Sequence, residues 1–371
     1  MPADGPPAGP GRGPPRIAIV GAGAVGAWVG GCMALAGHDV TLIDPWPAHV
    51  AAMNRDGLRL TDADGERRAR VLALDICNVQ SLNRRPVDIA FICMKLPDTA
   101  WATELIRPCL ADRGFVVTMQ NGLVEETVAG IVGWSRTLGA IASTISVELV
   151  GPGHVERTQR AGGDAYTVFR VGELHGGITA RAEAVAAMLR SCDSARVTGN
   201  LHGERWAKLV ANTMSTAVCG ISGLSLSEIV EHPGARALQI RLAGEAIRVG
   251  RALGYHLEPV RGLAADTWAA AAEGDARALE QCEAALRAGN ARRTGAGGRS
   301  GTAQDLAKGR WPEVEHMNGC VARLGREAGL PATTHERVTA LVIDAARGDL
   351  VPGIDALDRL VLELGVLPAS R

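Results

Sequence analysis

The chain opens with alternating apolar and glycine-rich segments that predict a strand, a tight turn, a helix and a second strand. Residues 16–20 form a short apolar run that stops at a glycine-rich stretch, and residues 28–36 continue as a helical pattern that ends at Gly37. A second apolar run, residues 39–43, begins just after that glycine and ends at Asp44. This order is typical of a βαβ unit with parallel strands.

The turn of this unit has the glycine spacing that is typical of dinucleotide-binding folds. Its residues are Gly21, Ala22, Gly23, Ala24, Val25 and Gly26. The first glycine permits a tight turn, the second lets the backbone approach a pyrophosphate, and the third lets the helix pack closely on the strand. The helix N-terminus offers amide groups and partial positive charge to phosphates. Gly21, Gly23, Ala24, Val25 and Gly26 are therefore candidate cofactor-binding residues; the alternative is a structural turn without a cofactor.

Asp44 is the candidate for choosing between the two nicotinamide cofactors. It lies 18 residues after Gly26, where a ribose-binding carboxylate belongs in such a unit. A carboxylate there accepts hydrogen bonds from the ribose hydroxyls and repels the 2′-phosphate of NADP. NAD is the predicted cofactor, and NADP is the other option. In the alternative reading, Asp44 only caps the turn that contains Pro45 and Pro47.

The alternation of strand and helix continues beyond this unit. Apolar runs predict strands at residues 87–94 and 115–119, with a helix at 99–110 between them. The result is a doubly wound parallel sheet. Lys95 and Asn121 follow the two strand ends, where ligands bind in open parallel sheets, so both are candidate cofactor-binding residues. A solvated lysine and an Asn-Gly turn are the alternative readings.

The sheet region ends with one more strand and a predicted hairpin. Residues 140–150 have a strand-like pattern, and Gly151-Pro152-Gly153 marks a turn with strand-like residues 166–171 behind it.

After residue 199 the pattern changes to long helical segments. Within residues 203–216, Lys208, Asn212 and Thr216 are spaced four apart, so one face of a single helix would carry an amine, an amide and a hydroxyl. A polar stripe among apolar residues needs partners, which a substrate cleft would supply. The alternative is the solvent-facing edge of an amphipathic helix.

The remaining sequence offers two more polar candidates among packing helices. Ser300 lies in a glycine-rich loop, and Glu313 follows Pro312 at the opening of a helical segment. Acidic residues after a proline also stabilise the first turn of a helix, so Glu313 has a structural alternative. Residues 234–283 and the final segment are predicted to be helical, and no chemistry is assigned to them.

Length and composition narrow the class of protein. At 371 residues the chain is long enough for two domains, predicted at 16–199 and 200–371 after a disordered tail at 1–15. A net charge of −1 and short basic clusters disfavour nucleic acid as a partner. The apolar runs are too short for a membrane helix. The eight cysteines are scattered, with no pattern that predicts a metal site, which favours reduced thiols in the cytoplasm.

The ordered series of short motifs resembles the ketopantoate reductase (2-dehydropantoate 2-reductase) family over about residues 16–345. The motifs are Gly21 to Gly26, Cys93-Met94-Lys95, Gln120-Asn121-Gly122, Gly151 to Val155, Arg205 to Leu209 with Asn212, and Gln304-Asp305 before Glu313 and Asn318-Gly319. The resemblance implies an N-terminal Rossmann domain and an all-helical C-terminal domain like that of 6-phosphogluconate dehydrogenases, with the active site between them. A homodimer through the helical domain is compatible with the sequence, but no sequence feature specifies it.

The resemblance also implies roles for the candidate residues. Lys208 would protonate the carbonyl oxygen as a hydride arrives, and Glu313 would help to hold substrate or cofactor. Asn212 would orient the substrate, Lys95 and Asn121 would flank the nicotinamide, and Ser300 would lie in the loop that meets the substrate carboxylate.

Three positions depart from the family pattern. Thr216 stands where a second asparagine is usual, Ser300-Gly301 where paired serines are usual, and Asp44 where a basic residue is usual. The predicted substrate is a small 2-oxo or 2-hydroxy acid, either ketopantoate or pantoate or a relative, and the first two changes leave that choice open because lost hydrogen bonds change specificity strongly. Dehydrogenation of a 3-hydroxy acid or of an opine-type product, and a non-catalytic NAD-binding sensor, are the competing functions.

Overall fold

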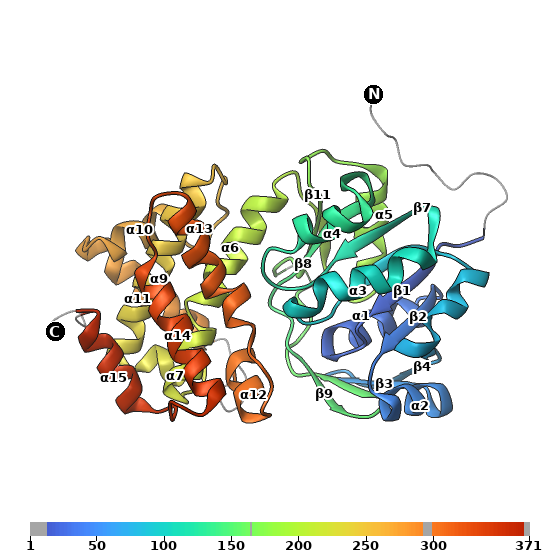
Figure 1. The fold of residues 1–371 in the computed structure, drawn as a ribbon, viewed down its shortest axis with the longest axis horizontal. Coiled ribbons are helices and arrows are strands. Elements are labelled where there is room, and N and C mark those ends of the chain that lie inside the picture. Colours follow the sequence, from blue (N-terminus) through green and yellow to red (C-terminus); the bar gives the residue numbers. More distant parts are fainter. Residues whose placement is uncertain (1–12, 164, 292–298, 367–371) are drawn as a thin grey trace. The chain divides into compact units, whose positions relative to one another are not determined.

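The computed structural model describes residues 13–163, 165–291 and 299–366 (Figure 1). It divides into two compact units, Met1–Leu201 and His202–Arg371. Most of the tail predicted at residues 1–15 lies outside the described residues.

The first unit contains an eight-stranded sheet in the order β12-β11-β8-β7-β6-β1-β2-β5. Its strands are β1 Arg16–Val20, β2 Asp39–Asp44, β5 Leu72–Asp75, β6 Val87–Ile92, β7 Leu110–Thr118, β8 Thr137–Ala142, β11 Phe169–Glu173 and β12 Ala195–Val197. All neighbouring pairs from β5 to β8 are parallel, and β11 pairs with β8 in the antiparallel direction. The sheet is therefore of the predicted Rossmann type, extended at one side by β11 and β12, which are parallel to each other and antiparallel to the other strands.

Helices cover both faces of this sheet. They are α1 Ala24–Leu35, α2 Pro47–Asp56, α3 Thr99–Ile106, α4 Glu125–Val132 and α5 Ala180–Leu189, with short 3-10 helices η1 Ile76–Arg84, η2 Leu96–Asp98, η3 Arg107–Cys109 and η4 Trp134–Arg136. Along β1, Ile17 and Ile19 face the core that includes α1 and α5, whereas Ala18 and Val20 face the core that includes α3 and α4. Burial on both faces explains why the strands are continuous apolar runs.

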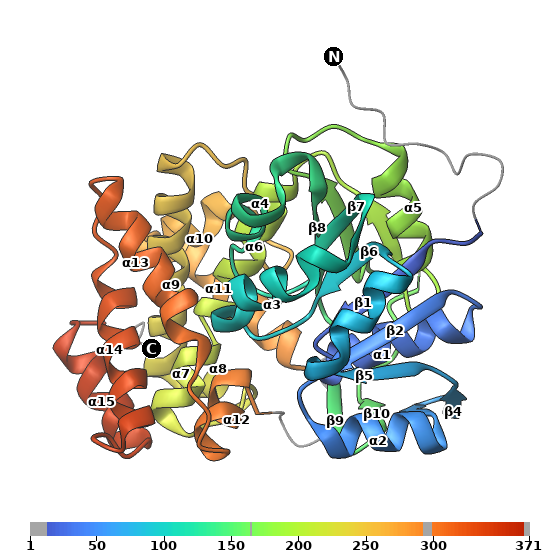
Figure 2. The ribbon, with the colours of Figure 1, turned by 45° about the vertical axis from the view of Figure 1, so that its right-hand side comes forward.

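A second sheet of four strands, β4-β3-β10-β9, was not predicted. Its strands are β3 Leu58–Asp62, β4 Gly65–Ala69, β9 Val147–Gly151 and β10 His154–Arg157. Both ribbon views place it beside α2 (Figure 2). Its inner face, which includes Leu58 and Leu60, packs in the same core as α1.

Two strand predictions were wrong in this region. Residues 140–150 do not form one strand, because β8 ends at Ala142 and β9 begins at Val147 in the other sheet. Thr144, between them, has a φ of +57°, which no extended strand can contain. The hairpin at Gly153 exists, but it joins β9 to β10, and residues 169–173 pair with β8 instead.

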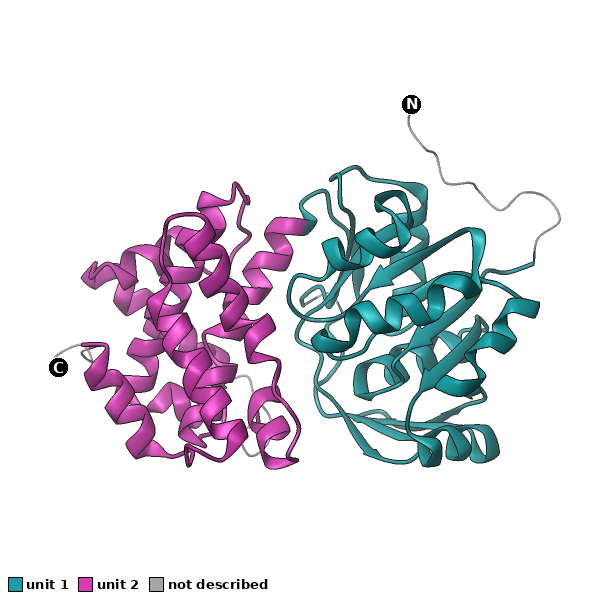
Figure 3. Cartoon of the chain, in the orientation of Figure 1, with its two compact units in different colours: residues 1–201 teal, residues 202–371 magenta. Residues whose placement is uncertain are grey.

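Among the described residues of the second unit, the regular elements are helices, and one isolated β-bridge joins Val260 and Leu263 (Figure 3). Its helices are α6 Leu201–Thr213, which begins at the last residue of the first unit, α7 Thr216–Ser222, α8 Glu228–Glu231, α9 Pro233–Ala252, α10 Ala265–Ala272, α11 Ala276–Ala291, α12 Gly301–Ala307, η5 Glu313–His316, α13 Asn318–Glu327, α14 Thr333–Arg347 and α15 Ile354–Glu363. The 20-residue helix α9 contacts α7, α10, α11, α13, α14 and α15 and forms the centre of this unit. No described helix is long and apolar enough to cross a bilayer.

Candidate functional site

The carboxyl ends of four adjacent parallel strands form one edge of the large sheet. Val20 pairs with Ile43 on one side and with Ile92 on the other, and Ile92 pairs with Thr118. The predicted cofactor residues follow this row at the ends of β1, β2, β6 and β7, as Gly21, Asp44, Lys95 and Asn121. The strand register therefore brings these four positions to the edge where ligands bind in such sheets.

The three glycines of the first turn differ in backbone conformation and surroundings. Gly21 has a φ of +98°, a conformation that residues with a Cβ rarely adopt. A Cβ on Gly26 would lie 2.0 Å from the Gly21 carbonyl oxygen, so only glycine lets α1 pass this close to the turn. A Cβ on Gly23, the N-cap of α1, would meet nothing within 4 Å, and no side chain caps this helix end. The space beside Gly23 and the uncapped helix end fit the pyrophosphate of a dinucleotide.

The different surroundings of Gly23 and Gly26 predict different effects of alanine at the two positions. Gly23→Ala is expected to weaken NADH binding about tenfold or more without loss of stability, because its Cβ occupies only the space offered to the pyrophosphate. Gly26→Ala is expected to lower the free energy of unfolding by about 1–3 kcal/mol as well, because its Cβ overlaps the backbone. Fluorescence titration with NADH and thermal unfolding measure the two effects. Unchanged NADH affinity in Gly23→Ala would show that no phosphate lies there.

Asp44 is 9% exposed and is held at the end of β2. Its Oδ1 accepts a 2.9 Å hydrogen bond from the Trp46 amide, just before α2 begins at Pro47. Burial raises the pKa of Asp44, and the Trp46 amide opposes that rise. The turn contact of the alternative reading is therefore present, and the ribose contact stays a prediction.

His49 is a buried residue of α2 that sequence reasoning missed. Its Nδ1 accepts a hydrogen bond of 2.8 Å from the Gly153 amide, so its Nε2 carries the proton and donates to the Ala22 carbonyl at 2.9 Å. The Trp46 ring stacks on it at 5.6 Å. His49 thus connects the glycine turn to the β9–β10 hairpin. A histidine in the first turn of a helix gives no sequence signal of this role.

In the second unit, α6 carries Lys208 and Asn212 one turn apart. Trp206 anchors this helix, because its indole is fully buried and donates to the Ala246 carbonyl of α9 at 2.9 Å. A Cβ on Gly250 would lie 2.3 Å from the indole nitrogen, so the two helices touch through a glycine. Lys208 and Asn212 are partly buried in a helix whose other residues are mostly buried.

The prediction of one helix through Thr216 was wrong. α6 ends at Thr213, and α7 begins at Thr216. The carbonyl of Asn212 accepts from the Ser215 amide at 3.0 Å and from the Thr216 hydroxyl at 3.0 Å, which ends the regular helical pattern. The Thr216 hydroxyl is therefore bonded to the backbone carbonyl of Asn212.

Asn318 and His335, both fully buried, hold the end of α6 in place. The Asn318 amide donates to the Thr213 carbonyl at 3.0 Å and to His335 Nδ1 at 3.2 Å. His335 Nε2 in turn donates to the Leu242 carbonyl of α9 at 2.9 Å. The helix that carries Lys208 is thus tied at its end to α13, α14 and α9.

The buried His335 predicts a pH dependence of stability. Burial lowers its pKa below the ordinary value of 6.5. As the pH falls through about 6.5, the unfolded chain binds a proton that the native ring does not, so the free energy of unfolding decreases, by at most about 1.4 kcal/mol per pH unit. Denaturant unfolding is measured between neutral and mildly acidic pH. The free energy of unfolding should decrease less for His335→Gln than for the unaltered chain. The exposed His316→Gln is the control, and equal slopes in the two variants would contradict the assignment.

Ser300 and Glu313 each lie at the start of a short helix. The Ser300 hydroxyl accepts from the Ala303 amide at 3.2 Å, which caps α12, and donates to the Thr216 carbonyl at 3.1 Å. Glu313 is partly buried and opens the short 3-10 helix η5 rather than an α-helix. The structure therefore brings Asn212, Thr216 and Ser300 together, and their contact with substrate stays a prediction.

Comparison with known proteins covers both units. The family model described as Ketopantoate reductase PanE/ApbA matches residues 17–169, and the model of its C-terminal part matches residues 200–346. The chain belongs to the ketopantoate reductase family. Curated proteins named 2-dehydropantoate 2-reductase are similar along nearly their whole length. The one from Archaeoglobus fulgidus is 28% identical, over 88% of this chain and 96% of its own, and the one from Halobacterium salinarum is 29% identical, over 90% and 99%.

Solved structures of this family and of a related dehydrogenase are similar to this chain. A PanE/ApbA family ketopantoate reductase from Ralstonia eutropha superposes with a TM-score of 0.72 and 27% identity, over 90% of this chain and 99% of its own. A D-mandelate dehydrogenase solved with NADH and anilino(oxo)acetate shares the fold, with a TM-score of 0.74 and 21% identity over 91% and 100%. As a ketopantoate reductase family member, the chain is an oxidoreductase that uses a nicotinamide cofactor and a small-molecule substrate, as predicted.

Proposed function

We propose that the chain transfers a hydride between the nicotinamide of NAD and C2 of a small 2-oxo or 2-hydroxy acid, with Lys208 as the proton donor or acceptor. The observation that carries this proposal is the match of the family to both units, one with a glycine turn that fits a pyrophosphate and the other with Lys208 on an anchored helix. The reduced cofactor supplies the hydride to the carbonyl carbon.

The proposed role of Lys208 follows from where charge develops. As the carbonyl carbon gains a hydride, its π electrons move to the oxygen, which becomes an alkoxide. An ammonium group within hydrogen-bond distance stabilises that oxygen and gives it a proton, and in the oxidative direction the neutral amine removes the proton from the alcohol. Two hydrogen bonds, from Trp206 of α6 to the Ala246 carbonyl and from Asn318 to the Thr213 carbonyl of α6, fix the backbone that carries this side chain.

The other candidate residues have supporting roles in this proposal. Asn212, one turn after Lys208, would orient the substrate, and Glu313 would hold substrate or cofactor. Lys95 and Asn121 would flank the nicotinamide at the sheet edge, and Asp44 would accept hydrogen bonds from the ribose and so favour NAD. In the substrate pocket, Thr216 and Ser300 donate to backbone carbonyls, which favours an acid that needs fewer hydrogen bonds than the usual family pattern offers.

A substrate panel tests the proposed function. The purified chain is assayed with 2-dehydropantoate and other 2-oxo acids, with 3-oxo acids, and with the corresponding hydroxy acids, each with NAD and NADP in the appropriate redox state. Turnover of a 2-oxo or 2-hydroxy acid, with a higher kcat/KM for the NAD couple, is expected. Binding of NADH without turnover of any acid would contradict the proposal and favour a sensor.

A further inference from the structure

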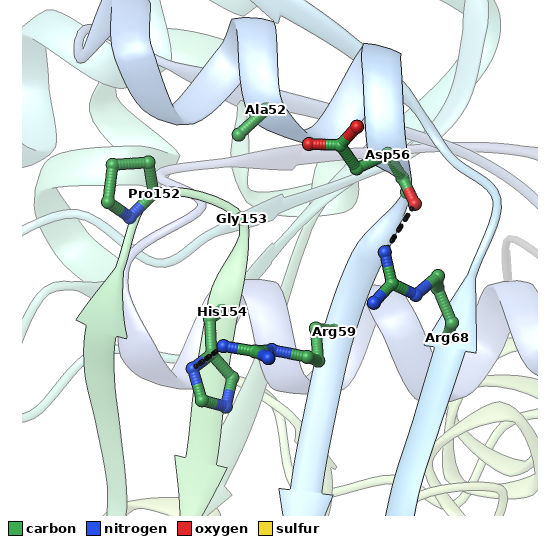
Figure 4. A pocket seen from close by; sticks show the side chains of 8 residues that line it. Ala52, Asp56, Arg59, Arg68, Pro152, Gly153 and His154 are labelled. Atoms are coloured by element: carbon green, nitrogen blue, oxygen red, sulfur yellow. Dashed lines mark hydrogen bonds between the residues drawn. The ribbon is translucent and has the colours of Figure 1, made fainter.

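A row of three basic side chains crosses the outer face of the small sheet. Arg68 on β4 lies directly opposite Arg59 on β3, and Arg59 lies directly opposite His154 on β10. Figure 4 shows the three side chains around one hollow, with the Arg59 guanidinium against the His154 ring and Arg68 on the far side. Arg59 Nη2 donates to His154 Nδ1 at 2.8 Å. The sheet register therefore places these groups together, independently of side-chain rotamers.

Like charges directly opposite each other on neighbouring strands are unfavourable. Glu66 offsets this in part, since its carboxylate lies 3.6 Å from Arg59 and 3.4 Å from Arg68. One carboxylate shared by two guanidinium groups leaves an excess of positive charge. Glu156 also lies near His154, and its charge acts against the lowering of the His154 pKa by burial and by Arg59.

The basic row lines a cavity of about 200 Å³. Its walls include Ala52 and Asp56 of α2 and the Pro152-Gly153 turn. The Asp56 carboxylate is paired with Arg55 at 2.6 Å, and the Asp56 carbonyl accepts from Arg68 at 3.0 Å. Pairing with Arg55 reduces the repulsion that Asp56 would exert on an anion in the cavity.

We propose that this cavity binds an oxyanion, a phosphate or carboxylate group of a small molecule, through Arg59 and Arg68. Each guanidinium has five N–H donors, and the contacts described use two on each, so both have donors for a ligand. Their planar arrangement suits paired hydrogen bonds to phosphate or carboxylate oxygens. The His154 ring is held by a hydrogen bond from its Nε2 to the Thr61 hydroxyl at 2.9 Å, and its Nδ1 accepts from Arg59, so the ring holds the Arg59 guanidinium in place.

This cavity is separate from the proposed dinucleotide site. Asp44 precedes the N-terminus of α2, whereas Asp56 ends that helix, and ten residues of helix span about 15 Å. The two places are nevertheless connected, because Gly153 in the cavity wall donates to His49, which donates to Ala22 in the glycine turn. The proposal does not depend on the reaction that the enzyme catalyses.

Calorimetric titration of the NADH-saturated enzyme tests this cavity, because NADH prevents phosphate from binding at the glycine turn. Inorganic phosphate and succinate are titrated separately at constant ionic strength, so that the two arms distinguish a phosphate ligand from a carboxylate ligand. We expect saturable binding of at least one anion at a single site. The double variant Arg59→Gln/Arg68→Gln should bind that anion about tenfold more weakly or worse.

The control is Arg85→Gln, an exposed arginine of the same unit that pairs with Asp39, and it should bind like the unaltered enzyme. NADH affinity and circular dichroism verify that the variants are folded. If the double variant does not fold, Arg68→Gln alone on the edge strand β4 replaces it. Absence of saturable binding in the unaltered enzyme, or equal affinity in the arginine variants, would overturn the proposal while leaving the proposed reaction intact.

Discussion

Lys208→Ala is expected to lower kcat by about 10³-fold or more while leaving NADH affinity unchanged. The variant loses both the proton donor and the positive charge beside the developing alkoxide, and each contributes about 10²-fold or more in other enzymes. Stopped-flow measurement of a single turnover, combined with NADH titration, separates the chemical step from cofactor binding.

Two further variants make this test specific. Lys208→Arg keeps the positive charge but does not give up a proton at neutral pH, so it should recover only a small part of the lost rate. Lys308→Ala removes an exposed lysine at the end of α12 and should leave kcat unchanged. Full activity of Lys208→Ala would exclude Lys208 as the acid–base group.

Asp44→Asn is expected to reduce the preference for NAD over NADP by about 100-fold or more in kcat/KM. The substitution weakens the hydrogen bonds offered to the ribose hydroxyls and removes the charge that repels a 2′-phosphate. Steady-state kinetics with each cofactor, over the same series of substrate concentrations, measure the ratio of kcat/KM for NAD to kcat/KM for NADP.

Asp75→Asn is the matched control for this change. Asp75 ends the neighbouring strand β5 directly beside Asp44 and accepts a hydrogen bond from the Cys77 amide in the same way that Asp44 accepts one from Trp46. It should leave the cofactor ratio unaltered. An equal change in both variants would mean that general electrostatics, and not a ribose contact, governs the choice of cofactor.

The large sheet could be predicted from the sequence because its signals are local. Strands buried on both faces are apolar runs, and the glycines of the first turn have a fixed spacing, so β1, α1 and β2 were located within a few residues. The small sheet was missed although Asp64-Gly65 lies between two alternating segments. Its β3–β10 pairing joins residues such as Arg59 and His154 that are distant along the chain, and no local pattern encodes that contact.

The break between α6 and α7 is a second feature that the sequence alone does not predict. Residues 213–216 contain neither glycine nor proline, so helical periodicity extends through them. The carbonyls freed at the break are bonded by Asn318 and by the Thr216 hydroxyl. Because the amide from Asn318 comes from a remote helix, a single sequence does not reveal where α6 ends or that Thr216 turns its hydroxyl to the backbone.

The hydrogen bonds that join His49 to Gly153 and to Ala22 limit how this fold can be redesigned. A protein engineer who trimmed residues 57–69 and 147–157 to obtain a smaller nucleotide-binding scaffold would delete Gly153 and leave the imidazole Nδ1 without its donor. A buried acceptor without a donor is costly, so the ring would reorient and release the Ala22 carbonyl. The minimal transplantable module therefore includes the four-stranded sheet along with the βαβ unit.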